Sequence, residues 1–127
     1  MRKSWYGRFT SSTVPHVYGR IDTELQSEFT SEKVESKLTF TYTGAYRNGQ
    51  RIVFDIESWL NEYNGLNFGV KNNNEFLSVQ YNIDSFSPTK ISGTYITNGP
   101  YDKGTFVIVP EGEPEPQIHN NGLCTIC

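Results

Sequence analysis

The chain has 127 residues, a length that predicts one domain large enough to bury a core of its own. Its formal net charge of −3 argues against a nucleic-acid-binding protein, and eight Phe, eight Tyr and two Trp against one Met indicate an aromatic core. No apolar run approaches the ~18 residues of a membrane helix, and no apolar segment follows the basic start as in a secretory signal. With two cysteines, both in the last four residues, we expect a cytoplasmic protein.

Apolar and polar residues alternate in eight segments, as they do in β-strands that bury one face. In the first segment, Trp5 and Phe9 share one face, while Tyr6 and Arg8 lie on the other. In the second segment, Gln26 falls on the polar face. The eight segments are residues 5–9, 17–29, 37–44, 51–60, 66–71, 76–83, 91–95 and 106–108.

Turn-forming residues separate these segments. Asn and Gly tolerate the positive φ angles that tight hairpins require, and short links imply that successive strands are antiparallel neighbours. The turns are expected at Asn48-Gly49, Asn64-Gly65, Asn72-Asn73-Asn74 and Ser87-Pro88. An alternative for residues 57–63 is a helical turn, in which Trp59 and Tyr63 lie four residues apart.

One-sided antiparallel strands bury their apolar faces either by closing into a barrel or by stacking as two sheets. The short links favour a small closed barrel over residues 1–109, and the longer connections at 10–16 and 30–37 leave a two-sheet sandwich as the alternative. Residues 110–127 are rich in proline and glutamate at their start, and we expect a flexible acidic tail there.

Two Gly-Thr-aromatic sequences, residues 93–95 and 104–106, flank one turn near the end of the chain. A glycine in a strand allows a sharp bend, or allows a neighbouring aromatic ring to lie across it. We therefore interpret Gly93 and Gly104 as sites of curvature in the sheet.

Residues 5–9, 91–95 and 102–106 together resemble the calycins, the lipocalin and avidin group of antiparallel barrels. In that group a Trp near the amino end closes the base of the barrel, and Gly-x-aromatic strands recur. The resemblance implies a barrel. Because Trp5 precedes Gly7 here, whereas lipocalins place the Gly first, no ligand-binding residues follow from it.

The polar residues do not form a recognisable catalytic or metal-binding motif. Asp55 and Glu57 share a strand face with Arg51, which is typical of a solvated surface. The only histidines, His16 and His119, lack the spacing of metal ligands, and neither a Gly-x-Ser-x-Gly sequence nor a phosphate-binding loop is present. We expect no enzymatic activity, no cofactor and no metal.

Outward-facing aromatic and basic side chains indicate an interaction surface, because amphipathic rings and Arg are favoured at protein interfaces. Tyr6, Arg8, Tyr18 and Trp59 are the candidates. We expect a binding or assembly module whose partner is another protein or a second copy, compatible with a viral or accessory protein. Basic and aromatic residues near the start also suit single-stranded nucleic acid, but the acidic net charge disfavours it.

The alternative function is that of a carrier for a small apolar ligand inside the barrel. Its ligand would contact inward-facing residues, but an interior crowded with Phe, Tyr, Ile and Leu favours a filled barrel. The residues concerned are Trp5, Phe40, Phe54, Tyr81 and Tyr95.

The sequence ends in Cys124-Thr125-Ile126-Cys127, which has the form of a prenylation box with Cys124 as the modified residue. A membrane is an expected partner only if Cys124 is lipidated. The terminal Cys and the acidic upstream residues argue against prenylation, and the same Cys-x-x-Cys could instead form a disulfide or bind a metal together with a second copy.

Overall fold

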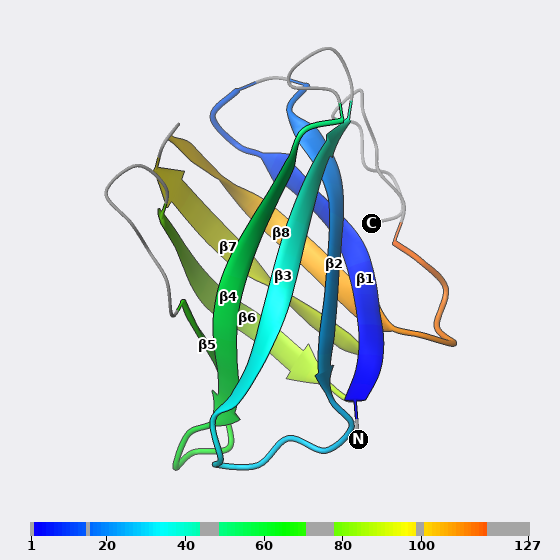
Figure 1. Ribbon diagram of the computed structural model, residues 1–127, viewed down its shortest axis with the longest axis vertical. Coiled ribbons are helices and arrows are strands. Elements are labelled where there is room, and N and C mark those ends of the chain that lie inside the picture. Colours follow the sequence, from blue (N-terminus) through cyan, green and yellow to red (C-terminus); the bar gives the residue numbers. More distant parts are fainter. Residues whose placement is uncertain (1, 15, 44–48, 71–77, 99–100, 117–127) are drawn as a thin grey trace.

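The structure of the protein, a computed structural model, describes residues 2–14, 16–43, 49–70, 78–98 and 101–116 (Figure 1). Within these ranges the chain forms eight strands and no helix, so the all-β prediction is confirmed. The strands are β1 Arg2–Ser11, β2 Tyr18–Gln26, β3 Val34–Thr43, β4 Arg51–Leu60, β5 Leu66–Val70, β6 Ser78–Ser87, β7 Lys90–Asn98 and β8 Asp102–Pro110.

All pairings between the strands are antiparallel, and they join the strands into one sheet in the order β5-β4-β3-β2-β1-β8-β7-β6. Because β1 pairs with both β2 and β8, the sheet curls into a nearly closed up-and-down barrel. The predicted barrel is thus confirmed, with one difference. In the described part of the chain β5 and β6 lie close together without pairing, which leaves a seam in the wall (Figure 1).

The helical alternative for residues 57–63 is wrong, because β4 continues to Leu60 and a turn follows it. The side-chain oxygen of Asn61 accepts hydrogen bonds from the backbone N–H groups of Tyr63 and Gly65, at 2.8 and 2.9 Å. Asn64 has a φ angle of 61°, which asparagine tolerates better than most residues. The turn predicted at Asn64-Gly65 is therefore present.

Aromatic rings fill the inside of the barrel. Phe40 is fully buried and stacks on Phe9 with ring centroids 4.6 Å apart, while the rings of Phe54 and Tyr95 meet it edge-on. Such pairs add to the ~1.5–3 kcal/mol gained by burying each large apolar side chain. The packed interior therefore supplies much of the stability of the fold.

Gly93 and Gly104 lie where a neighbouring strand approaches closely, and at Gly104 the side chain of Tyr95 also lies against the glycine. A Cβ atom on Gly104 would lie 2.7 Å from the Tyr95 hydroxyl and 2.1 Å from the carbonyl oxygen of Thr10. A Cβ atom on Gly93 would lie 2.0 Å from the carbonyl oxygen of Asn82. These positions accept only glycine without a shift of the neighbouring backbone.

The two ends of the barrel are closed by different means. At one end Phe29, from the connection between β2 and β3, packs edge-on against Trp5 and Phe86. At the other end, the buried carboxylate of Asp102 accepts hydrogen bonds from the hydroxyls of Tyr95 and Ser11, at 2.8 and 2.6 Å. At both ends, side chains that lie far apart in the sequence are thus held together.

The boundary predicted between residues 109 and 110 falls at the end of β8. Residues 111–116 are described, and they lie beside β1 (Figure 1). The rest of the predicted tail, including His119, Cys124 and Cys127, lies outside the described residues. No helix long and apolar enough to cross a membrane occurs in the part of the chain that the structure describes.

Candidate functional site: a groove between β2 and β3

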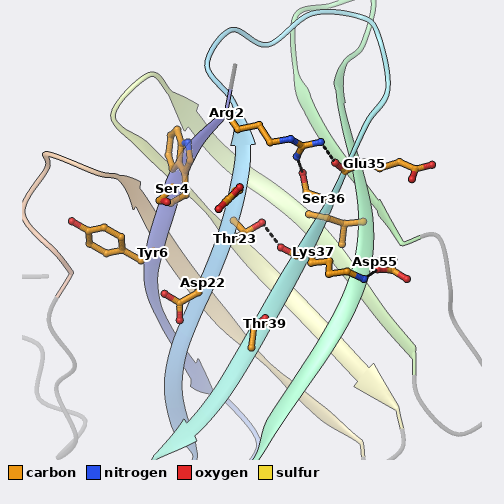
Figure 2. A pocket seen from close by; sticks show the side chains of 13 residues that line it. Arg2, Ser4, Tyr6, Asp22, Thr23, Glu35, Ser36, Lys37, Thr39 and Asp55 are labelled. Carbon is orange, nitrogen blue, oxygen red and sulfur yellow. Dashed lines mark hydrogen bonds and ion pairs between the residues drawn. The ribbon is translucent and has the colours of Figure 1, made fainter.

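The strands β2 and β3 stop pairing before either strand ends. Their last register pair joins Thr23 to Leu38, although β2 continues to Gln26 and β3 begins at Val34. Figure 2 shows the two strands diverging beyond this pair, with several polar side chains in the space between them. The barrel wall therefore has an opening in the middle of the sheet as well as at the seam.

The divergence follows from the way β2 ends. Leu25 and Gln26 are both buried, so the alternation of the strand breaks at its last residue. The Gln26 side-chain oxygen accepts a hydrogen bond of 2.9 Å from the hydroxyl of Ser58, a fully buried residue of β4. The prediction that Gln26 faces outward is therefore wrong, because its amide satisfies a hydroxyl inside the barrel. This link holds the side chain at the end of β2 against β4 inside the barrel.

Side chains take over the hydrogen bonding where the ladder stops. The Thr23 hydroxyl donates to the carbonyl oxygen of Lys37 at 2.8 Å. Arg2 reaches from β1 across β2, and its guanidinium donates to the Glu35 carbonyl at 2.6 Å and to the Ser36 hydroxyl at 2.9 Å (Figure 2). These bonds keep the opening at a defined width.

The opening is a groove of about 860 Å³. Its lining includes the buried residues Trp5 and Ile56, and its rim carries charged side chains from β2, β3 and β4. Across the rim, the Lys37 ammonium lies 2.6 Å from the Asp55 carboxylate (Figure 2). The charged residues of the lining are Arg2, Asp22, Glu24, Glu35, Lys37 and Asp55.

Trp5 contributes an unusual group to this lining. The side chain is 3% exposed, and its indole nitrogen Nε1 has no hydrogen-bond partner among the described residues. A buried N–H without an acceptor costs ~1–3 kcal/mol.

The predicted interaction residues do not form one surface. Tyr6 and Arg8 of β1 lie on the same outer face as Tyr18 of β2, and all three are half-buried. Tyr6 also borders the groove (Figure 2). Trp59 lies two strands away on β4, where the ammonium of Lys33 sits 4.8 Å from its ring.

The residues predicted to contact a ligand in the carrier alternative lie in the interior, packed against one another. Of these, Tyr81 packs against the core from β6, and its hydroxyl is buried without a partner in the described part of the chain. The five residues are Trp5, Phe40, Phe54, Tyr81 and Tyr95.

Asp55, Glu57 and His16 do not line one pocket together. Asp55 lines the groove and pairs with Lys37, whereas neither Glu57 nor His16 is among the lining residues. His16 is exposed in the connection between β1 and β2. Among the described residues, no group of three or more His, Cys, Asp or Glu could hold a metal ion.

No pattern in the sequence predicts the groove itself. Arg2 is one of several basic residues at the start of the chain, and no motif includes Thr23 or Ser36. The one residue that could have indicated an irregular end of β2 is Gln26, a large amide that follows the apolar Leu25. Comparison of this chain with protein-family models, curated proteins and solved structures finds no match.

Proposed function

We propose that this protein is a non-enzymatic protein-binding module that holds an extended segment of a partner protein in the groove between β2 and β3. The observation that carries the proposal is the end of the β2–β3 ladder at Thr23 and Leu38 while β2 continues for three residues. Beyond Thr23 this edge of β2 has no β3 residue as register partner, and Glu24 lines the groove instead. Such free edges are templates for an added strand.

The side chains around this edge suit a polypeptide. An extended segment that pairs with β2 would bring its backbone N–H and carbonyl groups into the groove beside Glu24. Charges of both signs on the rim, including Glu24 and Lys37, would select the side chains of the partner. Backbone pairing would supply affinity, and the rim would supply specificity.

The filled interior makes the carrier alternative the weaker one. The rings of Phe9, Phe40 and Tyr95 are in mutual contact and fully buried, so a ligand there would have to displace them. The resemblance to calycins and the cytoplasmic location stay predictions.

The test uses a photo-crosslinking amino acid, benzoylphenylalanine, at exposed Glu24 on the rim of the groove. The matched control carries it at Lys103, an exposed residue on the outer face of β8. We expect a partner protein to be crosslinked from position 24 and not from position 103.

In the complex with that partner, the backbone amide of Glu24 should exchange hydrogen about tenfold more slowly than in the free protein, as amides do when they enter a ladder, whereas the amide of Leu25, which already faces β1, should not change. Equal crosslinking at both positions, or protection elsewhere that leaves Glu24 unchanged, would show that the groove is not the binding site.

A further inference from the structure

Residues 111–116, which we call the acidic segment, follow β8 directly and cross the outer face of β1. The backbone N–H of Glu111 donates to the carbonyl oxygen of Ser4 at 2.8 Å. Further along, the hydroxyl of Tyr6 donates to the carbonyl of Glu113 at 3.4 Å, and Arg8 Nε donates to the carbonyl of Pro116 at 3.2 Å. The segment is thus fixed to the barrel at three points along its length.

The surface beneath the acidic segment carries an unfavourable pair of like charges. Arg8 of β1 and Arg20 of β2 are register partners, so their guanidinium groups project from the same face of the sheet. Like charges directly opposite each other on neighbouring strands are destabilising. An anion held between the two groups would remove the repulsion.

Glu115 supplies that anion. Its carboxylate forms an ion pair and a hydrogen bond with Arg20, and it lies 3.7 Å from the guanidinium of Arg8. Arg20 is further oriented by Asp22 at 2.9 Å and by the ring of Tyr6, whose centroid is 5.2 Å from the guanidinium carbon. The site therefore presents two directed cations beside an aromatic ring.

The segment begins with a turn over residues 111–113, in which Gly112 has a φ angle of 95°, and proline constrains the residues that follow. Pro114 and Pro116 flank Glu115, and proline restricts the chain to conformations close to polyproline II. Val109 lies on the outer face by the alternation of β8, yet it is only 7% exposed, which agrees with cover from the residues that follow β8.

We infer that the face formed by Tyr6, Arg8 and Arg20 is a recognition surface for acidic, proline-containing segments, and that residues 111–116 occupy it in cis. A partner protein with such a segment competes with the chain's own for the two arginines. The inference does not depend on the groove between β2 and β3. It assigns a second kind of partner, an acidic segment, to the outer face of β1 and β2.

The test measures binding of a labelled peptide, acetyl-EGEPEP-amide, to full-length protein by fluorescence anisotropy. In the Glu115→Lys variant the cis segment carries a repelling charge, so the surface becomes available. We expect this variant to bind the peptide about tenfold more tightly than the wild type. The matched control is Glu62→Lys, which makes the same charge change on the turn after β4, and its affinity should equal that of the wild type.

Two further measurements assign the binding to the arginines. Adding Arg20→Gln to Glu115→Lys should weaken binding of the peptide about tenfold relative to Glu115→Lys alone. A peptide whose second-to-last residue is Gln instead of Glu should bind Glu115→Lys about tenfold more weakly than the original peptide does. Circular dichroism should show the same β-sheet spectrum for every variant. Equal affinity of Glu115→Lys and Glu62→Lys, or full binding after Arg20→Gln, would overturn the inference.

Discussion

Two tyrosine hydroxyls inside the barrel have opposite surroundings. The hydroxyl of Tyr95 donates to the buried carboxylate of Asp102, whereas the hydroxyl of Tyr81 has no hydrogen-bond partner in the described part of the chain. A buried polar group without a partner lowers stability by the cost of removing it from water. The hydroxyl of Tyr95 therefore raises the free energy of unfolding, and the hydroxyl of Tyr81 lowers it.

Replacing each tyrosine with phenylalanine should separate these contributions. We expect Tyr81→Phe to leave the free energy of unfolding unchanged or to raise it by about 1 kcal/mol, because only the unpaired hydroxyl is lost. Tyr95→Phe should lower it by ~1–3 kcal/mol, because Asp102 loses a donor. Urea unfolding measures both, and a larger loss for Tyr81→Phe than for Tyr95→Phe would contradict the assignment.

At the scale of the strands, one hydrogen bond fixes the last residue of β2. Gln26 and Ser58 are buried partners, and their link holds Gln26 inside the barrel. A strand that kept its alternation would instead have placed Gln26 in solvent.

A double-mutant cycle tests this role. Gln26→Leu should lower the free energy of unfolding by ~1–3 kcal/mol, because the hydroxyl of Ser58 is left buried without its partner. Adding Ser58→Ala should recover part of the loss, since both polar groups are then absent. Additive losses in the double variant would show that the two side chains do not act as a pair.

The strands themselves were largely predictable, whereas their ends were not. The alternation that identifies a strand is local, so each of the eight segments was found from its own residues. At the start of β8, Asp102 is the register partner of Thr97 in β7, and at the end of β2 the buried Gln26 bonds to Ser58 of β4. Contacts between distant residues leave no periodic signal in the sequence.

At the scale of the whole molecule, the choice between barrel and sandwich rested on the connections. Short links predicted neighbouring strands, but closure required β1 to pair with β8, as Trp5 does with Pro110. No local pattern in the sequence predicts the pairing of β1 with β8. The cis contact between Glu115 and Arg20 is equally invisible in the sequence, because the proline- and glutamate-rich composition predicts a flexible acidic tail.

The buried tyrosines also make the stability of the whole domain depend on pH. Burial raises the pKa of the Tyr81 hydroxyl well above its usual value, and Tyr42 adds to this. Burial, followed by the nearby carboxylate of Asp102, raises the pKa of Tyr95. In the unfolded chain both groups lose their protons near pH ~10, while in the folded chain they keep them. Stability is therefore complete below that pH and falls as the pH rises above it.

Urea unfolding at a series of pH values from neutral to strongly alkaline should show this loss. In Tyr81→Phe the decline above pH ~10 should be shallower, because one of the two groups with a raised pKa is absent. Tyr63→Phe is the matched control, since Tyr63 is 84% exposed, and its decline should follow that of the wild type. A decline of the same steepness in all three proteins would contradict the prediction.

Because no ladder joins β5 to β6 in the described part of the chain, the sheet has a linear order. It begins at β6, passes through β7 and β8 to β1, and finishes at β5. Joining the two ends of this chain and cutting it between Val70 and Ser78 would make sequence order and spatial order identical, from one margin of the sheet to the other. In the present order, by contrast, β1 and β8 pair in the middle of the sheet, so β8, which is synthesised after the other seven strands, completes the centre of the sheet and not its border.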